Sequence, residues 1–154
     1  MAGLSVYRLE RGAPMRVGLI EGEGTSFSYD AAYLVLPKAA PLSLSLPLEA
    51  RAFDATELRP YFEGLLAEGQ ARSALAAELG LGEDDWLGLL AACGEECIGD
   101  VLICEEGAVP EVGETEYAPL ADAELRAMLL SETDVARENV RTRLSLAGTQ
   151  SKTA

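Results

Sequence analysis

Histidine is absent from the 154 residues, and basic residues are scarce, with 12 Lys and Arg against 26 Asp and Glu. The absence of histidine excludes Ser-His-Asp and Cys-His nucleophile systems, His-ligated zinc sites and acid–base catalysis by imidazole. Any catalysis must therefore use carboxylates, Lys, Arg, hydroxyl groups or a bound nucleotide. The net charge of −14 repels phosphate backbones, so we expect no direct contact with nucleic acid, whereas a basic partner protein would be attracted.

The chain also has few aromatic residues, few cysteines and no apolar run long enough to cross a membrane. Aromatic residues make up 6% of a chain that is 49% hydrophobic, so we expect a core of mainly Leu, Ala and Val. The three cysteines, Cys93, Cys97 and Cys104, have neither redox nor zinc spacing, which indicates buried free thiols in a reducing compartment. No secretory leader is recognisable, so we expect a cytoplasmic protein.

The hydrophobic patterns predict an α+β fold, with a small antiparallel sheet and helices packed on one side. Residues 4–29 alternate between turns and predict three strands of a meander. Asp30 is expected to cap a short helix over residues 31–35, which Pro37 ends. The run 41–48 alternates Leu and Ser between two prolines and predicts a short edge strand with one apolar face.

Three helices and a further strand are expected next. The first helix begins at Asp54 or Thr56, the second covers residues 71–79, and the third begins at Asp84-Asp85. Residues 100–104 read as a strand. The acid-rich segment that follows, up to Glu114, is the best linker candidate, and a further helix after Asp122 and a strand over residues 141–146 are expected beyond it.

Several side chains of these elements have two possible roles. Trp86 and Tyr61-Phe62 are expected in the core, with an interface role as the alternative. Ser43 and Ser45 are expected on the outward face of the edge strand, with a binding role as the alternative.

The last residues of the chain have the layout of a phosphate-binding loop. A strand-like run ending at Leu146 leads into the small residues Ala147 and Gly148, and Lys152 stands between hydroxyl residues. Small residues let backbone N–H groups approach phosphate oxygens, and a lysine adds a positive charge. A Walker loop would need glycines where Ser151 and Leu146 stand, and a common kinase loop needs three spaced glycines. On spacing alone, a nucleotide loop and a polar tail both remain open.

Four segments, in order, resemble the HipA family, the toxin half of bacterial HipA–HipB toxin–antitoxin systems. Residues 145–152 resemble its glycine-rich loop, and residues 41–48 resemble its Leu-Ser-Leu-Pro run. Residues 61–66 are similar to its aromatic, Leu-rich helix, and residues 94–101 are similar to its Gly-x-x-x-x-Gly-x-Val turn.

The resemblance implies a serine/threonine protein kinase with two lobes, which uses ATP and magnesium when complete. The serine that becomes phosphorylated in the family's loop maps onto Ser145. The rest of the implied ATP-phosphate loop is Ala147, Gly148, Thr149, Gln150 and Lys152, of which Thr149 is larger than the family's usual residue. The family's ATP lysine, catalytic aspartate and metal-binding aspartate have no counterpart here. We therefore expect no catalytic residue, no metal ligand and no bound nucleotide in this chain alone.

The resemblance also implies a domain organisation and partners. Residues 1–106 correspond to the HipA N-terminal subdomain, and residues 107–154 to a linker, helix and strand that lead into the loop of an incomplete kinase lobe. The implied partners are a DNA-binding antitoxin of the HipB type and further copies of the protein. Two functions stay open: the front portion of a HipA-like toxin kinase, or a stand-alone interaction module, such as the small subunit or antitoxin-like partner of a split system.

Overall fold

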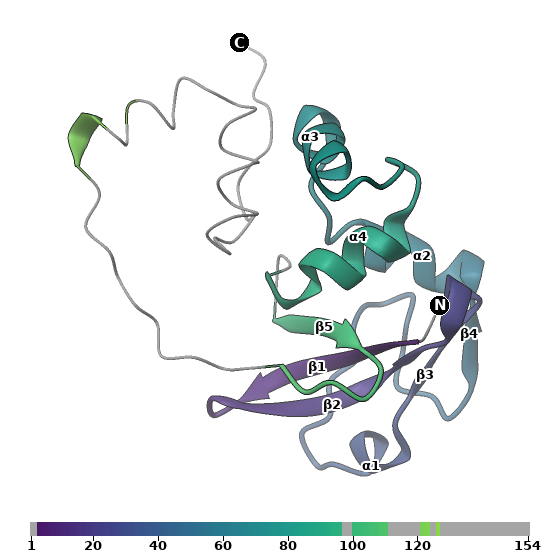
Figure 1. The fold of residues 1–154 in the computed structure, drawn as a ribbon. Coiled ribbons are helices and arrows are strands. Elements are labelled where there is room, and N and C mark those ends of the chain that lie inside the picture. The colour runs from purple at the N-terminus through teal and green to yellow at the C-terminus, as the bar shows by residue number, and fades with distance from the viewer. Residues whose placement is uncertain (1–2, 97–99, 111–120, 124–125, 127–154) are drawn as a thin grey trace.

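The fold is a five-stranded antiparallel sheet with its three longer helices on one side and a short helix apart from them (Figure 1), which confirms the predicted α+β class. The computed structural model describes residues 3–96, 100–110, 121–123 and 126. The spatial order of the strands is β4-β3-β2-β1-β5. Their bounds are Leu4–Glu10 for β1, Ala13–Ile20 for β2, Ser26–Tyr29 for β3, Ala52–Asp54 for β4 and Val101–Glu105 for β5.

The first three strands form the predicted meander. Arg11 and Gly12 connect β1 to β2 with φ angles of 53° and 83°, the left-handed pair that a two-residue hairpin turn requires. The register shifts between Val6 and Tyr7, so that Val17 of β2 is an extra, fully buried residue. Such a bulge increases the local twist of the sheet.

The helices begin and end near the predicted residues because their caps are local in sequence. Their bounds are Ala31–Leu34 for α1, Ala55–Glu63 for α2, Gly69–Leu79 for α3 and Trp86–Cys93 for α4, with 3-10 turns η1 at Gly22–Gly24 and η2 at Gly94–Glu96. Asp54 forms a capping box with Glu57 at the start of α2. Asp85 caps α4 by accepting from the Gly88 N–H, and Gly80 ends α3 with a left-handed φ of 68°.

The core contains mainly aliphatic residues, as predicted, but all three phenylalanines are concentrated in it. Phe27, Phe53 and Phe62 are each fully buried, and the Phe27 ring lies 5.5 Å from that of Phe62 in α2. Trp86 and Phe62 are buried as expected, and Tyr61 packs half-buried against the core. The aromatic cluster therefore joins the sheet to the helices that cover it.

Two local predictions were wrong. The run 41–48 is a tight turn and not an edge strand: Ser43 and Leu46 pair as an isolated antiparallel bridge, which puts Leu44 and Ser45 at the tip of the turn. Leu42 and Leu46 of this run are therefore buried in the core, whereas Leu44 is exposed. Asp30 precedes α1 but makes no capping hydrogen bond, because its carboxylate faces Arg16 at 3.4 Å instead, and α1 ends at Leu34, one residue earlier than predicted.

The predictions for the C-terminal part concern residues that lie largely outside those described. The linker candidate began at Glu105, which is the last residue of β5, and its part beyond Pro110 lies outside the described residues. So do the strand over residues 141–146, the beginning of a kinase-like lobe and the whole of the implied loop. Residues 122, 123 and 126 are helical. Among the described residues, no helix is both long and apolar enough to span a membrane.

Candidate functional site

A buried tyrosine holds both ends of the turn 41–48. Tyr29, at the end of β3, donates its hydroxyl proton to the Leu46 carbonyl at 2.5 Å and accepts the Leu42 N–H at 2.8 Å. Burial raises the pKa of the Tyr29 hydroxyl above its ordinary value. Since Leu42 and Leu46 are themselves buried, one side chain of the sheet fastens the two flanks of the turn to the core.

A second tyrosine and an arginine hold the segment that enters the turn. Tyr33 of α1 stacks on Tyr29, with ring centroids 6.0 Å apart, and donates its hydroxyl to the Ala40 carbonyl at 2.8 Å. The Arg8 guanidinium, from β1, donates to the Tyr33 hydroxyl at 2.8 Å, to the Ala40 carbonyl at 2.6 Å and to the Pro41 carbonyl at 3.1 Å. A planar fork of donors suits such a set of neighbouring acceptors.

Arg8 also binds an acidic residue at the start of β5. Its Nε lies 2.9 Å from the Asp100 carboxylate, and the Arg8 side chain is only 13% exposed. Burial disfavours the charged form, but the hydrogen bond to Tyr33 and the charge of Asp100 outweigh it, so that the pKa of Arg8 is raised. Arg8 therefore stays charged while it links β1, α1, the turn and β5. We call Arg8, Tyr29 and Tyr33 the clamp.

The clamp presents an apolar side chain to solvent at the tip of the turn. Leu44 is 100% exposed, whereas Leu42 and Leu46 on either side are buried. Beneath it, the hydroxyl groups of Ser43 and Ser45 are hydrogen-bonded to each other at 2.8 Å. The two serines thus support the turn.

A separate group of ion pairs is centred on Arg51, just before β4. Arg51 binds Glu49 and Glu57, each at 2.7 Å, and its guanidinium lies 3.9 Å from the centroid of the Phe53 ring. These contacts join β4 to the start of α2. Among the described residues, no group of three or more Cys, Asp or Glu is placed to hold a metal ion.

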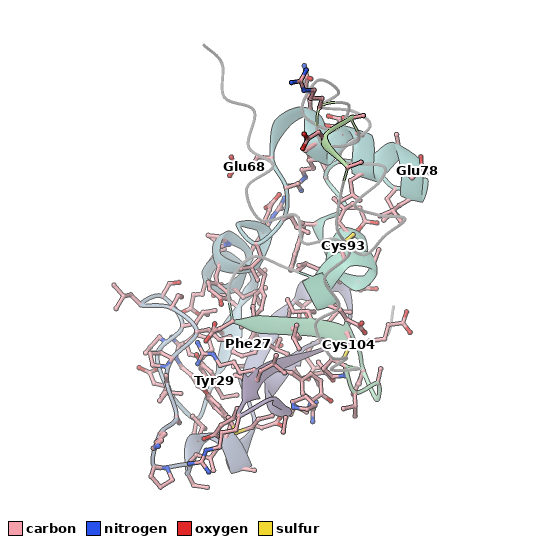
Figure 2. All side chains as sticks on the ribbon, turned by 90° about the vertical axis from the view of Figure 1, so that its left-hand side faces the viewer. Phe27, Tyr29, Glu68, Glu78, Cys93 and Cys104 are labelled. Carbon is pink, nitrogen blue, oxygen red and sulfur yellow. The ribbon has the colours of Figure 1, made fainter. Side chains whose placement is uncertain are left out.

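The described cysteines form no disulfide. Cys104 is buried in β5, where burial raises the pKa of its thiol, and its Sγ lies 3.4 Å from the Ala108 carbonyl oxygen. Cys93 is half-buried in α4, and Figure 2 shows both side chains. The prediction of free thiols is confirmed for these two, and that of burial for Cys104, whereas Cys97 lies outside the described residues.

The predicted loop residues cannot be compared with the clamp, because Ser145, Ala147, Gly148, Thr149, Gln150 and Lys152 lie outside the described residues. The three clamp residues were not recognised from the sequence. A signal was present: Tyr29 and Tyr33 are four residues apart, and Arg8 is the one basic residue of its strand.

The family model of the HipA N-terminal domain matches residues 13–104, which include the turn and most of the sheet. The chain belongs to the HipA N-terminal domain family. Two of the segments that resembled HipA proteins lie within these bounds and are fully described. Residues 41–48 form the clamped turn, and residues 61–66 comprise the last three residues of α2 and the three that follow it.

Two curated proteins are similar to this HipA-family chain. It is 35% identical over 132 residues to "Putative kinase Y4mE" of Sinorhizobium fredii, which covers 82% of this chain and 31% of Y4mE. It is 36% identical over 92 residues to an "Uncharacterized protein" of Haemophilus influenzae, which covers 58% of this chain and 83% of that protein. The chain therefore matches less than a third of Y4mE but most of the Haemophilus protein.

Proposed function

We propose that this chain is the N-terminal portion of a HipA-like serine/threonine protein kinase. The observation that carries the proposal is the extent of the similarity to Y4mE. The aligned stretch covers 82% of the chain, whereas residues 1–104 make up only about two thirds of it. The similarity to a protein named as a kinase therefore extends beyond the residues that the family model matches.

In this proposal, residues 145–152 cover the phosphates of ATP in the complete kinase. Gly148 and its small neighbour Ala147 let backbone N–H groups approach phosphate oxygens, and Lys152 supplies a positive charge. Phosphorylation of Ser145 adds close to two negative charges, which would repel ATP and displace the loop. Phosphoryl transfer also needs magnesium ligands and a positioned catalytic carboxylate, so the complete kinase must supply both from outside this segment.

The test is incubation of the chain with magnesium and γ-labelled ATP, with intact Y4mE treated in parallel. We expect label on Y4mE and none on this chain, because a loop without positioned metal and catalytic groups lacks the preorganised charges that the transfer needs. Label on Ser145 of the chain alone would show that it is catalytic by itself. Failure of folded Y4mE to transfer phosphate would remove the support for a kinase.

A second candidate function is a stand-alone interaction module of a split HipA-type system. One observation favours it: the match covers 83% of the Haemophilus relative, so this domain forms most of a complete protein there. In this role the chain would bind a separate kinase polypeptide or a DNA-binding antitoxin of the HipB type, and further copies of the chain are another possible partner.

The charge of −14 supports binding to a basic antitoxin. Association driven by opposite charge weakens as salt rises. Binding of a HipB-type antitoxin that does not change between low and high salt, or the absence of such binding, would contradict this partner.

A further inference from the structure

The tip of the clamped turn is the most exposed apolar feature in the described part of the chain. Four large apolar side chains are exposed there: Leu44 at 100%, Val35 at 80%, Val109 at 63% and Leu9 at 46%. Only Leu44 and Val35 lie within the residues that the family model matches. An exposed apolar side chain is unremarkable alone, so the surroundings of Leu44 decide its meaning.

The turn is preorganised before any partner arrives. Both of its flanks are hydrogen-bonded to Tyr29, and its entry is held by Tyr33 and Arg8. A contact made by a rigid segment loses little conformational entropy on binding, which favours affinity. A fully exposed leucine on a turn tied down by a buried hydroxyl therefore has the properties of a binding anchor.

The segment that contains the turn is itself nearly free of charge, and the charged group at its entry, Arg8, is paired with Asp100. Residues 31–48 contain one charged residue, Lys38, and no other run in the chain is as long without Asp or Glu. The acids at its two ends are paired, Asp30 with Arg16 and Glu49 with Arg51. The centre of a protein interface is depleted of charged residues, and this segment meets that condition in a strongly acidic chain.

The carboxylates nearest the turn are each paired with an arginine: Asp100 with Arg8, Asp30 with Arg16 and Glu49 with Arg51. Glu68 and Glu78, near the two ends of α3, lie far from Tyr29 (Figure 2). The pairing reduces the repulsion that these carboxylates would exert on another acidic protein surface.

Pairing of a further strand with the sheet is a weaker alternative. Beside β5, the Ile103 carbonyl oxygen lies 2.5 Å from the position of a Cβ on Gly94, so η2 covers that edge closely. At the other edge, β4 has three residues, and Arg51 already donates to the Ala52 carbonyl. Short or covered edges discourage strand addition, which leaves the turn as the better docking surface.

The occupant follows from the relatives. This chain matches 31% of Y4mE, so more than two thirds of that protein lies outside the match and has to be arranged relative to this domain. Interfaces between domains of one chain resemble protein–protein interfaces, in which the buried centre is depleted of charged residues. The turn lies within the residues that the family model matches, whereas Val109 and Leu9 do not.

We propose that the turn 41–48 docks on the kinase portion of a HipA-like protein, and that Leu44 inserts there into an apolar pocket. The inference rests on the proposed kinase function. The contact forms within one chain where the domain is fused to the kinase portion, as in Y4mE. It forms between chains where the domain is most of a protein, as in the Haemophilus relative.

The test measures binding of this chain to the part of Y4mE outside the match, produced as a separate polypeptide, by calorimetric titration. Three variants are compared with the wild type: Leu44→Ala, Leu44→Glu and the control Val109→Glu, which changes another exposed apolar residue. Because Leu44 makes no buried contact, its variants should fold normally, which their thermal melting checks. We expect roughly 10- to 100-fold weaker binding for Leu44→Ala, no binding for Leu44→Glu and a change under about twofold for Val109→Glu.

If the separated Y4mE portion does not fold, intact Y4mE decides the question. Its residue aligned with Leu44 is changed to Glu, and unfolding is followed by calorimetry. The proposal predicts one coupled transition in the native protein and two separate transitions in the variant.

The docking proposal is overturned if the folded Y4mE portion does not bind the wild-type chain, if Leu44→Glu binds as well as wild type, or if the variant of intact Y4mE unfolds like the native protein. It is also overturned if Leu44→Glu only converts a dimer of this chain to a monomer, since the occupant would then be a second copy. Phosphate transfer by intact Y4mE is measured separately, so failure of the docking contact is distinguishable from failure of the kinase assignment.

Discussion

Replacing Tyr29 by phenylalanine tests whether the clamp holds the turn. The change removes one hydroxyl group and leaves the stacked ring in place against Tyr33. Two backbone groups lose their partner, the Leu42 N–H at 2.8 Å and the Leu46 carbonyl at 2.5 Å. Both hydrogen bonds are buried, so water cannot replace the hydroxyl without a rearrangement of the turn.

The expected loss of stability follows from these two bonds. Leaving a buried donor or acceptor unsatisfied costs about 1–3 kcal/mol, and partial relaxation of the turn recovers some of the cost for two such groups. We therefore expect a loss of roughly 2–4 kcal/mol in the free energy of unfolding. For a chain of 154 residues, each kcal/mol corresponds to a fall in Tm of about 2–4 °C, so Tm should fall by at least about 4 °C.

The assay is urea unfolding together with amide hydrogen exchange, and Tyr7→Phe is the matched control. The Tyr7 hydroxyl makes one partly buried hydrogen bond, to the Ala108 carbonyl at 2.9 Å, so its loss should cost about 1 kcal/mol. In Tyr29→Phe the Leu42 amide should exchange faster, whereas amides of β1 should change only as far as global stability requires. Equal destabilisation by the two variants, or an unchanged Leu42 amide, would refute the role assigned to Tyr29.

Three further predictions concern the same scaffold. Arg8→Lys keeps the charge near Asp100 but loses the fork to Tyr33 and the turn, so urea unfolding should show a loss of about 1–2 kcal/mol; a neutral result would contradict the clamp. Gly18→Ala should lower the free energy of unfolding by about 1–3 kcal/mol in the same urea assay, because the added Cβ would overlap the Ser28 carbonyl and the Phe27 ring. In the control Gly82→Ala, the added Cβ meets open space, so the change should stay within about 0.5 kcal/mol. Hydrogen bonds from Thr56 lower the pKa of Asp54 in the folded state. The stabilisation by the Asp54 charge is therefore present above the unfolded-state pKa, about 3.9, and is lost as pH falls through the folded-state pKa. The Tm difference between wild type and Asp54→Asn should shrink between about pH 5 and pH 3, and a constant difference would exclude this linkage.

The elements predicted best from the sequence are those whose signals are local. Asp54 with Glu57 three residues later is a capping box, and it begins α2 where the pattern placed it. Gly80 ends α3 because a left-handed residue there costs glycine little. The meander was predictable because its hairpin turn and alternation lie within a few residues of each other.

The turn 41–48 was mispredicted because its conformation depends on distant residues. Alternating Leu and Ser has the period of a strand, and nothing within the run distinguishes a strand from a bridge-closed turn. The deciding contacts come from Tyr29, 17 residues before Leu46, and from Arg8, 33 residues before Pro41. Such long-range hydrogen bonds leave no periodic trace in the sequence.

The functional assignment depended on motifs more than on physical pattern. The spacing around Gly148 did not decide between a nucleotide loop and a polar tail, and the order of four resembling segments favoured the HipA family, which the match over residues 13–104 then showed. The role of Leu44 needed the structure, because its exposure is visible only once the flanking leucines are placed in the core.

The most direct test of the central claim is to map phosphorylation on this chain by mass spectrometry after incubation with intact Y4mE, magnesium and ATP. As the front portion of such a kinase, the chain should carry phosphate at Ser145, the Ser145→Ala variant should carry none in that segment, and no phosphate should appear without Y4mE. Phosphorylation confined to other residues, or an unmodified chain beside autophosphorylated Y4mE, would contradict the account.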